Sequence, residues 1–263
     1  MPHPTALIHP DAQIHPTADI GPYVIIDGPA IISERCRIEA HAQIIGQVHL
    51  APDCVIGRAA IIGAAPQDLG FDPATISGVE IGPRTVIREH VTIHRGSKPD
   101  SLTRLGSDNF LMVGCHLGHD VIIGSHNIIA NAALLAGHVH VGDRTFIGGG
   151  AVFHQFLRIG DSCVIQGNGS FSKDIPHYCC AQRINRITGL NIIGLRRQGF
   201  TSQDRAELKS LFDLLFRSGR NLSQAIESAA NTPWSPRAAH LLDFVTTPGR
   251  KGICAVRPGK DEE

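Results

Sequence analysis

The sequence predicts a mainly β protein: a left-handed parallel β-helix of hexapeptide repeats over residues 1–190, followed by a small α-helical domain over residues 191–263. Three observations support this fold class. Aliphatic residues recur at every sixth position, glycine often follows the aliphatic residue, and the pattern becomes helical after Pro176. A six-residue period is typical of a parallel β-helix, in which three hexads close one triangular coil.

The six-residue period keeps its register over most of the first two thirds of the chain. It runs from Ile8 to Ile62, resumes one residue out of phase from Ile81 to Ile93, and continues from Leu105 to Phe171. Segments such as IGRAAI and IGDSCV place glycine directly after the aliphatic residue. We expect these glycines to supply the backbone freedom that a corner needs. A β-sandwich with regular turns is the alternative fold.

Two segments interrupt the repeat and are expected to loop out of the prism. They are residues 66–80 (PQDLGFDPATISGVE) and residues 96–104 (GSKPDSLTR). Both are polar or contain proline and glycine, which favour irregular structure. Because binding groups are often carried on loops that a rigid scaffold holds, these two segments are candidates for substrate contacts.

Helix signals begin after the repeat. Thr201 or the next residue provides a polar N-cap, and Gly219 provides a stop signal. Ser235 is the expected cap of a last helix whose first residue is Pro236, a favourable position for proline. The tail after Pro248 is polar and is expected to be loose. The helices therefore cap one end of the prism and reduce its unpaired strand edges.

Composition limits the functional classes. The 24 basic and 24 acidic residues balance, so no overall charge points to nucleic acid or to a membrane surface. The seven cysteines contain no CxxC pair, which indicates reduced thiols rather than a disulfide framework. The N-terminal segment resembles no signal peptide, and no stretch is long and apolar enough to span a bilayer. We therefore expect a soluble, cytoplasmic protein without stable membrane insertion.

The segment GCHLGHDVIIG concentrates the candidate chemistry. It places His116 and His119 beside Asp120, and all three lie off the inward aliphatic position. His138 and His154 follow on the next coils, near one stripe of the prism. An imidazole beside a carboxylate can form a base that works near neutral pH, and it is also half of a zinc site.

Six motifs carry a resemblance to a known family: PQDLG, IREHVTIHRG, GSDNFLMVGCHLGHD, LAGHV, AVFHQF and NIIGLRRQGF. In this order they resemble the UDP-N-acetylglucosamine O-acyltransferases of lipid A biosynthesis (the LpxA family), over nearly the whole chain. The resemblance implies transfer of an (R)-3-hydroxyacyl chain from acyl carrier protein to the glucosamine 3-hydroxyl of UDP-N-acetylglucosamine. It further implies a homotrimer with its site between neighbouring prisms, and no metal or other cofactor is expected.

The resemblance also implies roles for individual residues. It makes His119 the general base, Asp120 the group that orients the imidazole, and Gly137 the donor to the oxyanion. The remaining matches are sugar and acyl contacts at His116, His138, His154 and Gln155, loop contacts at Gln67 and Asp68, nucleotide contacts at Asn191 and Arg197, and a position that sets acyl length at Gly167.

Three departures from the family pattern lie around the expected nucleotide sugar, at Gly70, Ile193 and Gln198. Because of these departures, the sequence does not decide whether the acceptor sugar carries a 3-hydroxyl or a 3-amine. Other readings are a zinc-dependent hydratase with histidine ligands shared between subunits, and a structural repeat protein without activity. A related N-acyltransferase of the next step is expected to carry an extra N-terminal domain, whereas the hexads here start at Ile8.

Overall fold

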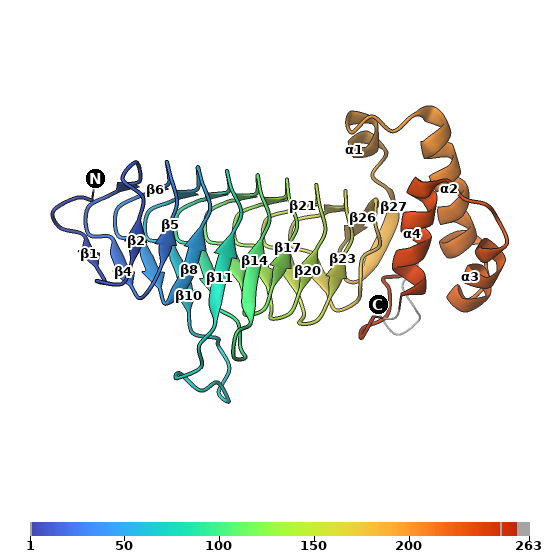
Figure 1. Cartoon of the computed structure of the whole chain (residues 1–263). Coiled ribbons are helices and arrows are strands. Elements are labelled where there is room, and N and C mark those ends of the chain that lie inside the picture. The colour runs from blue at the N-terminus through green and yellow to red at the C-terminus, as the bar shows by residue number, and fades with distance from the viewer. Residues whose placement is uncertain (1, 248, 257–263) are drawn as a thin grey trace.

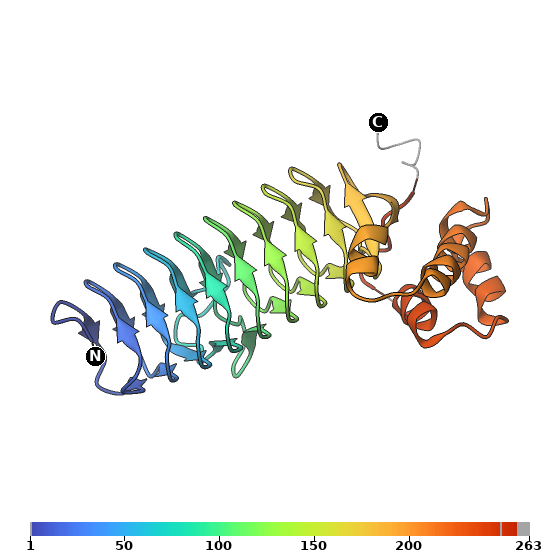
Figure 2. The ribbon, with the colours of Figure 1, turned by 90° about the horizontal axis from the view of Figure 1, so that it is seen from above.

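Short parallel strands wind into a three-sided prism, and helices pack at one end of it (Figures 1 and 2). The computed structural model describes residues 2–247 and 249–256. The chain visits the three faces of the prism in turn, and three successive hexads make one coil. The described residues thus form the predicted left-handed parallel β-helix.

Each face is one sheet. The first face contains β1 (Leu7–Ile8), β4 (Ile25–Asp27), β7 (Gln43–Ile45), β10 (Ile61–Ala64), β13 (Thr92–His94), β16 (His116–Leu117), β19 (Leu134–Leu135), β22 (Val152–Phe153) and β25 (Ser170–Phe171). The second face contains β2 (Gln13–Ile14), β5 (Ile31–Ile32), β8 (Gln47–Leu50), β11 (Gly78–Ile81), β14 (Leu102–Leu105), β17 (Ile122–Ile123), β20 (His140–Val141) and β23 (Arg158–Ile159). The third face contains β3 (Asp19–Ile20), β6 (Arg37–Ile38), β9 (Val55–Ile56), β12 (Val86–Ile87), β15 (Phe110–Leu111), β18 (Ile128–Ile129), β21 (Phe146–Ile147) and β24 (Val164–Ile165), and ends with β26 (Cys179–Gln182) and the antiparallel β27 (Arg186–Leu190).

The aliphatic residues of the hexads stack in columns inside the prism. Leu117 pairs with Leu135, and Leu135 pairs with Phe153, each one coil further along the first face. All three side chains are buried. The strict register is explained by this packing, because a shift by one residue would turn an aliphatic side chain outward.

The turn after each face is called here the first, second or third corner, after the face that precedes it. The third residue after the aliphatic residue often has a positive φ, as in Asp120 (58°) and His138 (59°). The corner glycines serve a different purpose from the expected backbone freedom, because Gly57 and Gly82 do not have positive φ. A Cβ there would lie 2.7 Å and 2.6 Å from backbone atoms of the next coil. Glycine is required at these corners by close packing between coils.

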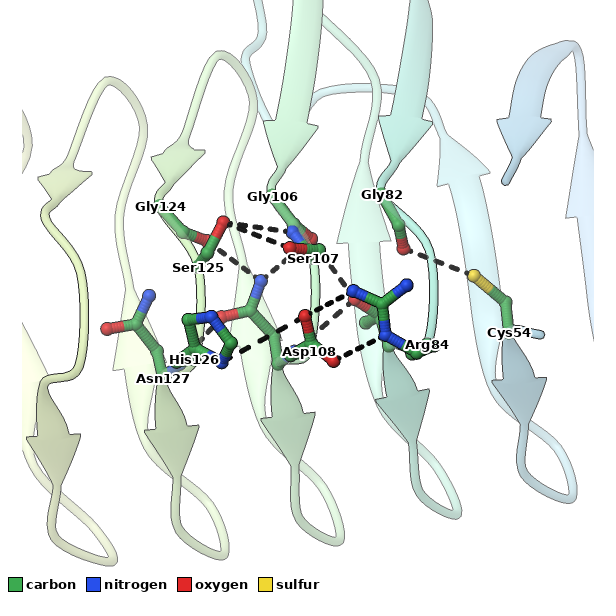
Figure 3. Close-up of polar contacts among 12 residues, drawn as sticks. Cys54, Gly82, Arg84, Gly106, Ser107, Asp108, Gly124, Ser125, His126 and Asn127 are labelled. Carbon is green, nitrogen blue, oxygen red and sulfur yellow. Dashed lines mark hydrogen bonds and ion pairs between the residues drawn. The ribbon is translucent and has the colours of Figure 1, made fainter. Parts of the chain in front are cut away.

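Polar side chains connect successive coils at the second corner (Figure 3). The Ser107 amide donates a hydrogen bond of 3.1 Å to Oγ of Ser125, and Arg84 forms an ion pair of 2.6 Å with Asp108. The Asn127 amide donates to Oδ1 of the buried Asn109. The hydrogen bonds to Ser125 and Asn109 satisfy backbone N–H groups in the turns, which do not take part in the hydrogen bonds of the sheets.

The two predicted loops project beside each other near the middle of the prism, and the longer one is visible below β10 and β11 in Figure 1. Both are shorter than predicted, covering residues 65–77 and 95–101, because β11 already begins at Gly78 and β14 at Leu102. The two loops are joined by a hydrogen bond of 2.6 Å from Oγ of Ser77 to the carbonyl oxygen of Gly96.

The helical part contains α1 (Ile192–Arg197), α2 (Ser202–Arg217), α3 (Leu222–Ala230) and α4 (Pro236–Thr246). The predicted caps are confirmed, because the side chains of Thr201 and Ser235 accept from backbone amides of α2 and α4. Tyr178 of the prism packs in the helical core, and Phe212 of α2 packs in the prism core. The helices are therefore anchored on the end of the prism by shared apolar contacts.

The tail is not uniformly loose, which corrects the expectation for the residues after Pro248. Asp174 and Ile253 form a parallel bridge, and the amide of Cys254 donates to the carbonyl oxygen of Asp174 at 2.9 Å. The Cys254 side chain is buried in the prism core. Residues 249–256 therefore return to the prism and are called here the C-terminal strap. Among the described residues, no helix combines the length and the apolar character that crossing a membrane would require.

Candidate active site

A hydrogen-bonded imidazole–carboxylate pair lies at the first corner. Nδ1 of His119 lies 2.8 Å from Oδ2 of Asp120, and these side chains are only 18% and 12% exposed. Because a carboxylate accepts, Nδ1 of His119 carries the proton in this pair. The other ring nitrogen, Nε2, is then left with a lone pair that can accept a proton from a substrate.

Asp120 is held by groups from the second loop and the preceding coil. The Ser97 amide donates to its Oδ2 at 3.0 Å, and its own amide donates to Oγ1 of Thr103 at 2.9 Å. Burial raises the pKa of Asp120, but hydrogen bonds from Ser97 and His119 outweigh burial and leave this pKa below its ordinary value. The carboxylate is therefore ionised at neutral pH and can stabilise a positive charge on His119.

Two further imidazoles flank the pair on the first face. The rings of His94 and His116 meet edge to face at 5.0 Å, and Nδ1 of His94 donates to the carbonyl oxygen of Ala65 at 2.6 Å. Burial, with a smaller contribution from His94, lowers the pKa of His116 to about 4. Burial also lowers the pKa of His94. Both rings are thus neutral at pH 7 and can exchange hydrogen bonds with a polar, uncharged ligand.

His138 continues the site one coil further along the first corner. Its Nε2 lies 3.7 Å from Oδ2 of Asp120, and its ring meets that of His119 edge to face at 5.0 Å. On its other side it stacks on Phe156 at 4.5 Å. Burial lowers the pKa of His138, although the Asp120 charge opposes this effect. His138 therefore restricts the position of the His119 ring.

A first pocket of about 560 Å³ opens beside His119 on the first face. Its polar lining includes the predicted residues Gln67, His116, His119, His154 and Gln155, together with His94. Leu134, Val152, Phe153 and Phe171 supply apolar surface in the same pocket. The pocket thus offers polar groups near the imidazole and an apolar surface that extends toward the helical end.

Gly137 lies directly against the His119 ring. A Cβ at residue 137 would come within 2.6 Å of both Cε1 and Nε2 of His119. Within residues 2–247 and 249–256, the amide N–H of Gly137 has no hydrogen-bond acceptor. An unpaired backbone donor next to an imidazole is suited to a negative oxygen that forms during a reaction.

Three predicted site residues lie elsewhere in this chain. Asn191 and Arg197 line a separate pocket of about 660 Å³ beside the third face, called here the third-face pocket. Gly167 lies at the third corner, where its Cβ would come 2.8 Å from the carbonyl oxygen of Gly149. None of the three lines the pocket around His119. A single chain therefore does not bring all the predicted residues together.

Two of the departures from the family pattern lie at the third-face pocket, and the other lies in the first loop. Ile193 and Gln198 line the third-face pocket, where Oε1 of Gln198 accepts from Oγ of Ser162 at 2.7 Å. Gly70 lies in the first loop, and its amide donates to Oδ1 of Asp68 at 2.9 Å. Gln198 thus helps to attach α1 to the prism.

Sequence reasoning missed His94 and Ser97. His94 directly follows the inward Ile93, so it lies at the first corner, one coil before Gly118. Its position in the hexad could have identified it as a candidate site residue. Ser97 lies in an irregular loop, and no period indicates which loop amide reaches Asp120. The position of His94 was therefore accessible from the period, whereas the contact from Ser97 was not.

Two groups of side chains in the described residues are close enough to hold a metal ion. One is His119, Asp120 and His138, and the other is Asp161, His177 and His240 at the junction with α4. In the first group, Nδ1 of His119 is already used by the short hydrogen bond to Asp120. The geometry of this group suits an acid–base pair better than a metal centre.

The fold is that of a hexapeptide-repeat β-helix protein, and its candidate site is an imidazole–carboxylate pair beside a pocket. A family model described as UDP-N-acetylglucosamine O-acyltransferase, domain 2, matches residues 174–254. The acyl-(acyl-carrier-protein)–UDP-N-acetylglucosamine O-acyltransferase of Thermodesulfovibrio yellowstonii is 40% identical over 255 residues, which cover 96% of this chain and 98% of that protein. The chain therefore belongs to the UDP-N-acetylglucosamine O-acyltransferase family.

Two further comparisons agree with this assignment. The Chlorobaculum tepidum protein of the same name is 52% identical over 195 residues, or 73% of this chain and 74% of its own length. The crystal structure of LpxA, a UDP-N-acetylglucosamine acyltransferase from Bacteroides fragilis, superposes with a TM-score of 0.90 at 38% identity, covering 96% of this chain and 99% of that one. The similarity includes both the prism and the helices.

Proposed function

We propose that this acyltransferase transfers an (R)-3-hydroxyacyl chain from acyl carrier protein to the 3-position of the glucosamine ring of UDP-N-acetylglucosamine, in the first step of lipid A biosynthesis. The names of the relatives support the donor and the acceptor. The observation that carries the proposal is the short His119–Asp120 hydrogen bond beside an open pocket.

The proposed mechanism uses His119 first as a base and then as an acid. Nε2 takes the proton of the sugar hydroxyl while the hydroxyl oxygen bonds to the thioester carbonyl carbon. The carbonyl electrons move onto oxygen, and the Gly137 N–H stabilises that oxyanion. When the carbonyl re-forms, the carbon–sulfur bond breaks, and the thiolate of the carrier takes the proton from His119. Asp120 stabilises the imidazolium between the two steps.

The pocket lining supports the proposed substrate contacts. Gln67, His116, His138, His154 and Gln155 surround the base and can contact the sugar and the first atoms of the acyl chain. Asp68 is on the same loop as Gln67 and can accept from sugar hydroxyls. The neutral state of His116 suits a neutral sugar ring, because no charge must be desolvated.

A homotrimer is proposed because a single chain separates Asn191 and Arg197 from His119. A neighbouring copy could present its third face, with these two residues, to the first pocket and so complete the nucleotide contacts. Apolar side chains remain exposed on both faces, Ile128 and Phe146 on the third and Leu134 on the first. Covering such side chains favours association between copies. The cytoplasm is the proposed location.

Product analysis tests the proposed function. Purified protein, UDP-N-acetylglucosamine and a series of (R)-3-hydroxyacyl carrier proteins should give an acylated sugar nucleotide whose fragments place the chain at the 3-position. A parallel reaction with the 3-amino analogue of the acceptor decides between ester and amide formation. Absence of an acylated product from every donor would contradict the proposal.

Activity is expected to be independent of metal. The base in the proposed mechanism is an imidazole already paired with Asp120, so no metal-bound water is needed. Prolonged dialysis against a strong chelator should leave turnover unchanged, and elemental analysis should find no stoichiometric zinc. Loss of activity that zinc restores would favour the hydratase reading.

Gly167 is proposed to set acyl length from the third corner, where it would meet an acyl chain that runs between copies. Gly167→Met is expected to shift preference toward shorter donors, since each methylene displaced from an apolar groove costs about 0.8 kcal/mol. The new Cβ would also crowd the Gly149 carbonyl, so some loss of thermal stability is expected. Turnover with ten-, twelve- and fourteen-carbon donors distinguishes the two effects. A changed ratio between donors indicates an effect on acyl length, whereas crowding alone slows all donors equally.

A further inference from the structure

The first loop, residues 65–77, carries two of the proposed substrate contacts but has little packing of its own. Gln67 lines the first pocket, and Asp68 lines a second pocket of about 600 Å³ that also borders His119. From residue 67 to residue 74 every residue is exposed except Phe71, which is half-buried. The loop projects from the prism below β10 and β11 (Figure 1). Its middle part therefore depends on a few contacts from the body of the protein.

Arg95, the first residue of the second loop, contacts this middle part at two points. Its Nη2 donates a hydrogen bond of 3.1 Å to the carbonyl oxygen of Pro73, and its Cζ lies 5.3 Å from the centre of the Phe71 ring. A cation over an aromatic ring and a hydrogen bond from a charged donor are both favourable. Nε of Arg95 is buried without an acceptor in the described part of the chain, so the hydrogen bonding of this side chain is directed to the loop.

The segment that Arg95 contacts is joined by hydrogen bonds to the proposed substrate contacts. The amide of Phe71 donates to the carbonyl oxygen of Asp68 at 3.0 Å, and the amide of Gly70 donates to Oδ1 of Asp68 at 2.9 Å. These bonds close a turn over residues 68–71, so a displacement of Phe71 also moves Asp68. Gln67 directly precedes the turn. The position of the Phe71 ring thus affects both substrate contacts.

The position of Arg95 in the repeat corresponds to that of His119, one coil earlier at the first corner. Ile93 pairs with Leu117, and Arg95 and His119 each follow their inward residue by two positions. Arg95 nevertheless lines neither of the two pockets that border His119. Its guanidinium contacts the loop and lies outside the space that a substrate could occupy. A role through the loop is therefore favoured over direct contact with a substrate.

We propose that Arg95 is a positioning residue for the acceptor, which holds the first loop so that Gln67 and Asp68 meet the sugar beside His119. This inference rests on the proposed function, since it takes the two loop residues as sugar contacts. A loop that is already fixed in the free protein loses less conformational entropy when the sugar binds. Removal of Arg95 therefore weakens acceptor binding and leaves the proton transfer to His119 unaffected.

Arg95→Ala is expected to raise the KM for UDP-N-acetylglucosamine about tenfold, the size of effect that one lost hydrogen bond to a charged group has. The KM for the acyl carrier protein and kcat should change much less. Arg95→Lys keeps a cationic donor without the flat guanidinium, so its KM should lie between the two. Arg217→Ala is the matched control and should leave both KM values unchanged. Arg217 makes the same two kinds of contact, from Nη2 to the carbonyl oxygen of Thr188 at 3.1 Å and from Cζ to the Phe212 ring at 5.1 Å.

Three further measurements distinguish positioning from other roles. Backbone amides of the first loop should exchange with deuterium faster in Arg95→Ala, while the melting temperature stays within a few degrees of wild type. Phe71→Leu removes the ring and should reproduce both the faster exchange and the raised acceptor KM, which provides the same test if Arg95→Ala does not fold. In a double variant with Gln67→Ala and Asp68→Ala, the further change Arg95→Ala should raise the acceptor KM little more.

Other results would overturn the proposal. An unchanged acceptor KM in Arg95→Ala, or full additivity with the double variant of the loop, would show that Arg95 does not act through these contacts. A higher apparent pKa in the pH profile of kcat would assign Arg95 to an electrostatic effect on His119, because removing a nearby cation favours the imidazolium. A lower melting temperature with equal rises in both KM values would indicate a general structural role. If the wild-type protein transfers no acyl group, the proposed function fails, whereas unchanged loop exchange in Arg95→Ala contradicts the positioning role itself.

Discussion

His119→Ala is expected to lower turnover by about 10²–10⁴-fold, the usual contribution of a general base, while the melting temperature stays within a few degrees of wild type. The imidazole lies at a corner outside the aliphatic columns, so its removal opens no cavity in the core. Steady-state rates with a carrier-protein donor, together with a thermal melt, measure both effects. KM for the acceptor should change much less than kcat.

The chain contains a matched control for this substitution. His126 and Asp108 form another imidazole–carboxylate pair, with 3.9 Å between Nδ1 and Oδ2, at the second corner (Figure 3). His126→Ala should leave turnover unchanged. If His119→Ala retained more than half of the wild-type rate, or if both variants lost activity equally, His119 would not be the base.

Gly137→Ala is expected to reduce kcat by about a hundredfold, because a displacement of about 1 Å in a catalytic group can have an effect of this size. The added Cβ would lie 2.6 Å from two atoms of the His119 ring, so the ring must move. The backbone N–H of residue 137 remains in place in this variant. The substitution therefore tests the position of the imidazole more than the oxyanion contact.

A double variant makes the Gly137 test specific. In a His119→Ala background, Gly137→Ala should cause little further loss, since no ring remains to be displaced. Gly189→Ala is the control, because its Cβ would have no closer neighbour than Nη2 of Arg217 at 3.8 Å. Full additivity of the two substitutions, or equal losses in the control, would contradict a steric effect through His119.

Much of the fold could be predicted because one physical constraint repeats. A buried column accepts only apolar side chains at one position in six, so the period alone indicates the β-helix. The helix caps at Thr201 and Ser235 could be predicted for a similar local reason, since a side-chain oxygen must accept from the first turn. The His119–Asp120 pair was also accessible, because the two residues are adjacent in sequence.

Other features depended on contacts between distant segments. The corner glycines are explained by backbone atoms of the next coil, which no local pattern displays. The C-terminal strap looks like a loose polar tail in sequence, but Cys254 completes the prism core and its amide pairs with Asp174. The loop amide of Ser97 reaches Asp120 only because the loop folds back on the first corner.

The prism, its coil length and the adjacent His119 and Asp120 could all be predicted from the sequence alone, since each depends on the period or on neighbouring residues. The period also gives the corner of Gly167, which follows His119 by two coils and two further hexads and so lies at another corner. Asn191 and Arg197 leave the repeat altogether, and only the folded structure shows that they lie at the third-face pocket. This difference arises because a coil returns to the same corner after three hexads, whereas loops and helices have no period from which a position in space can be calculated.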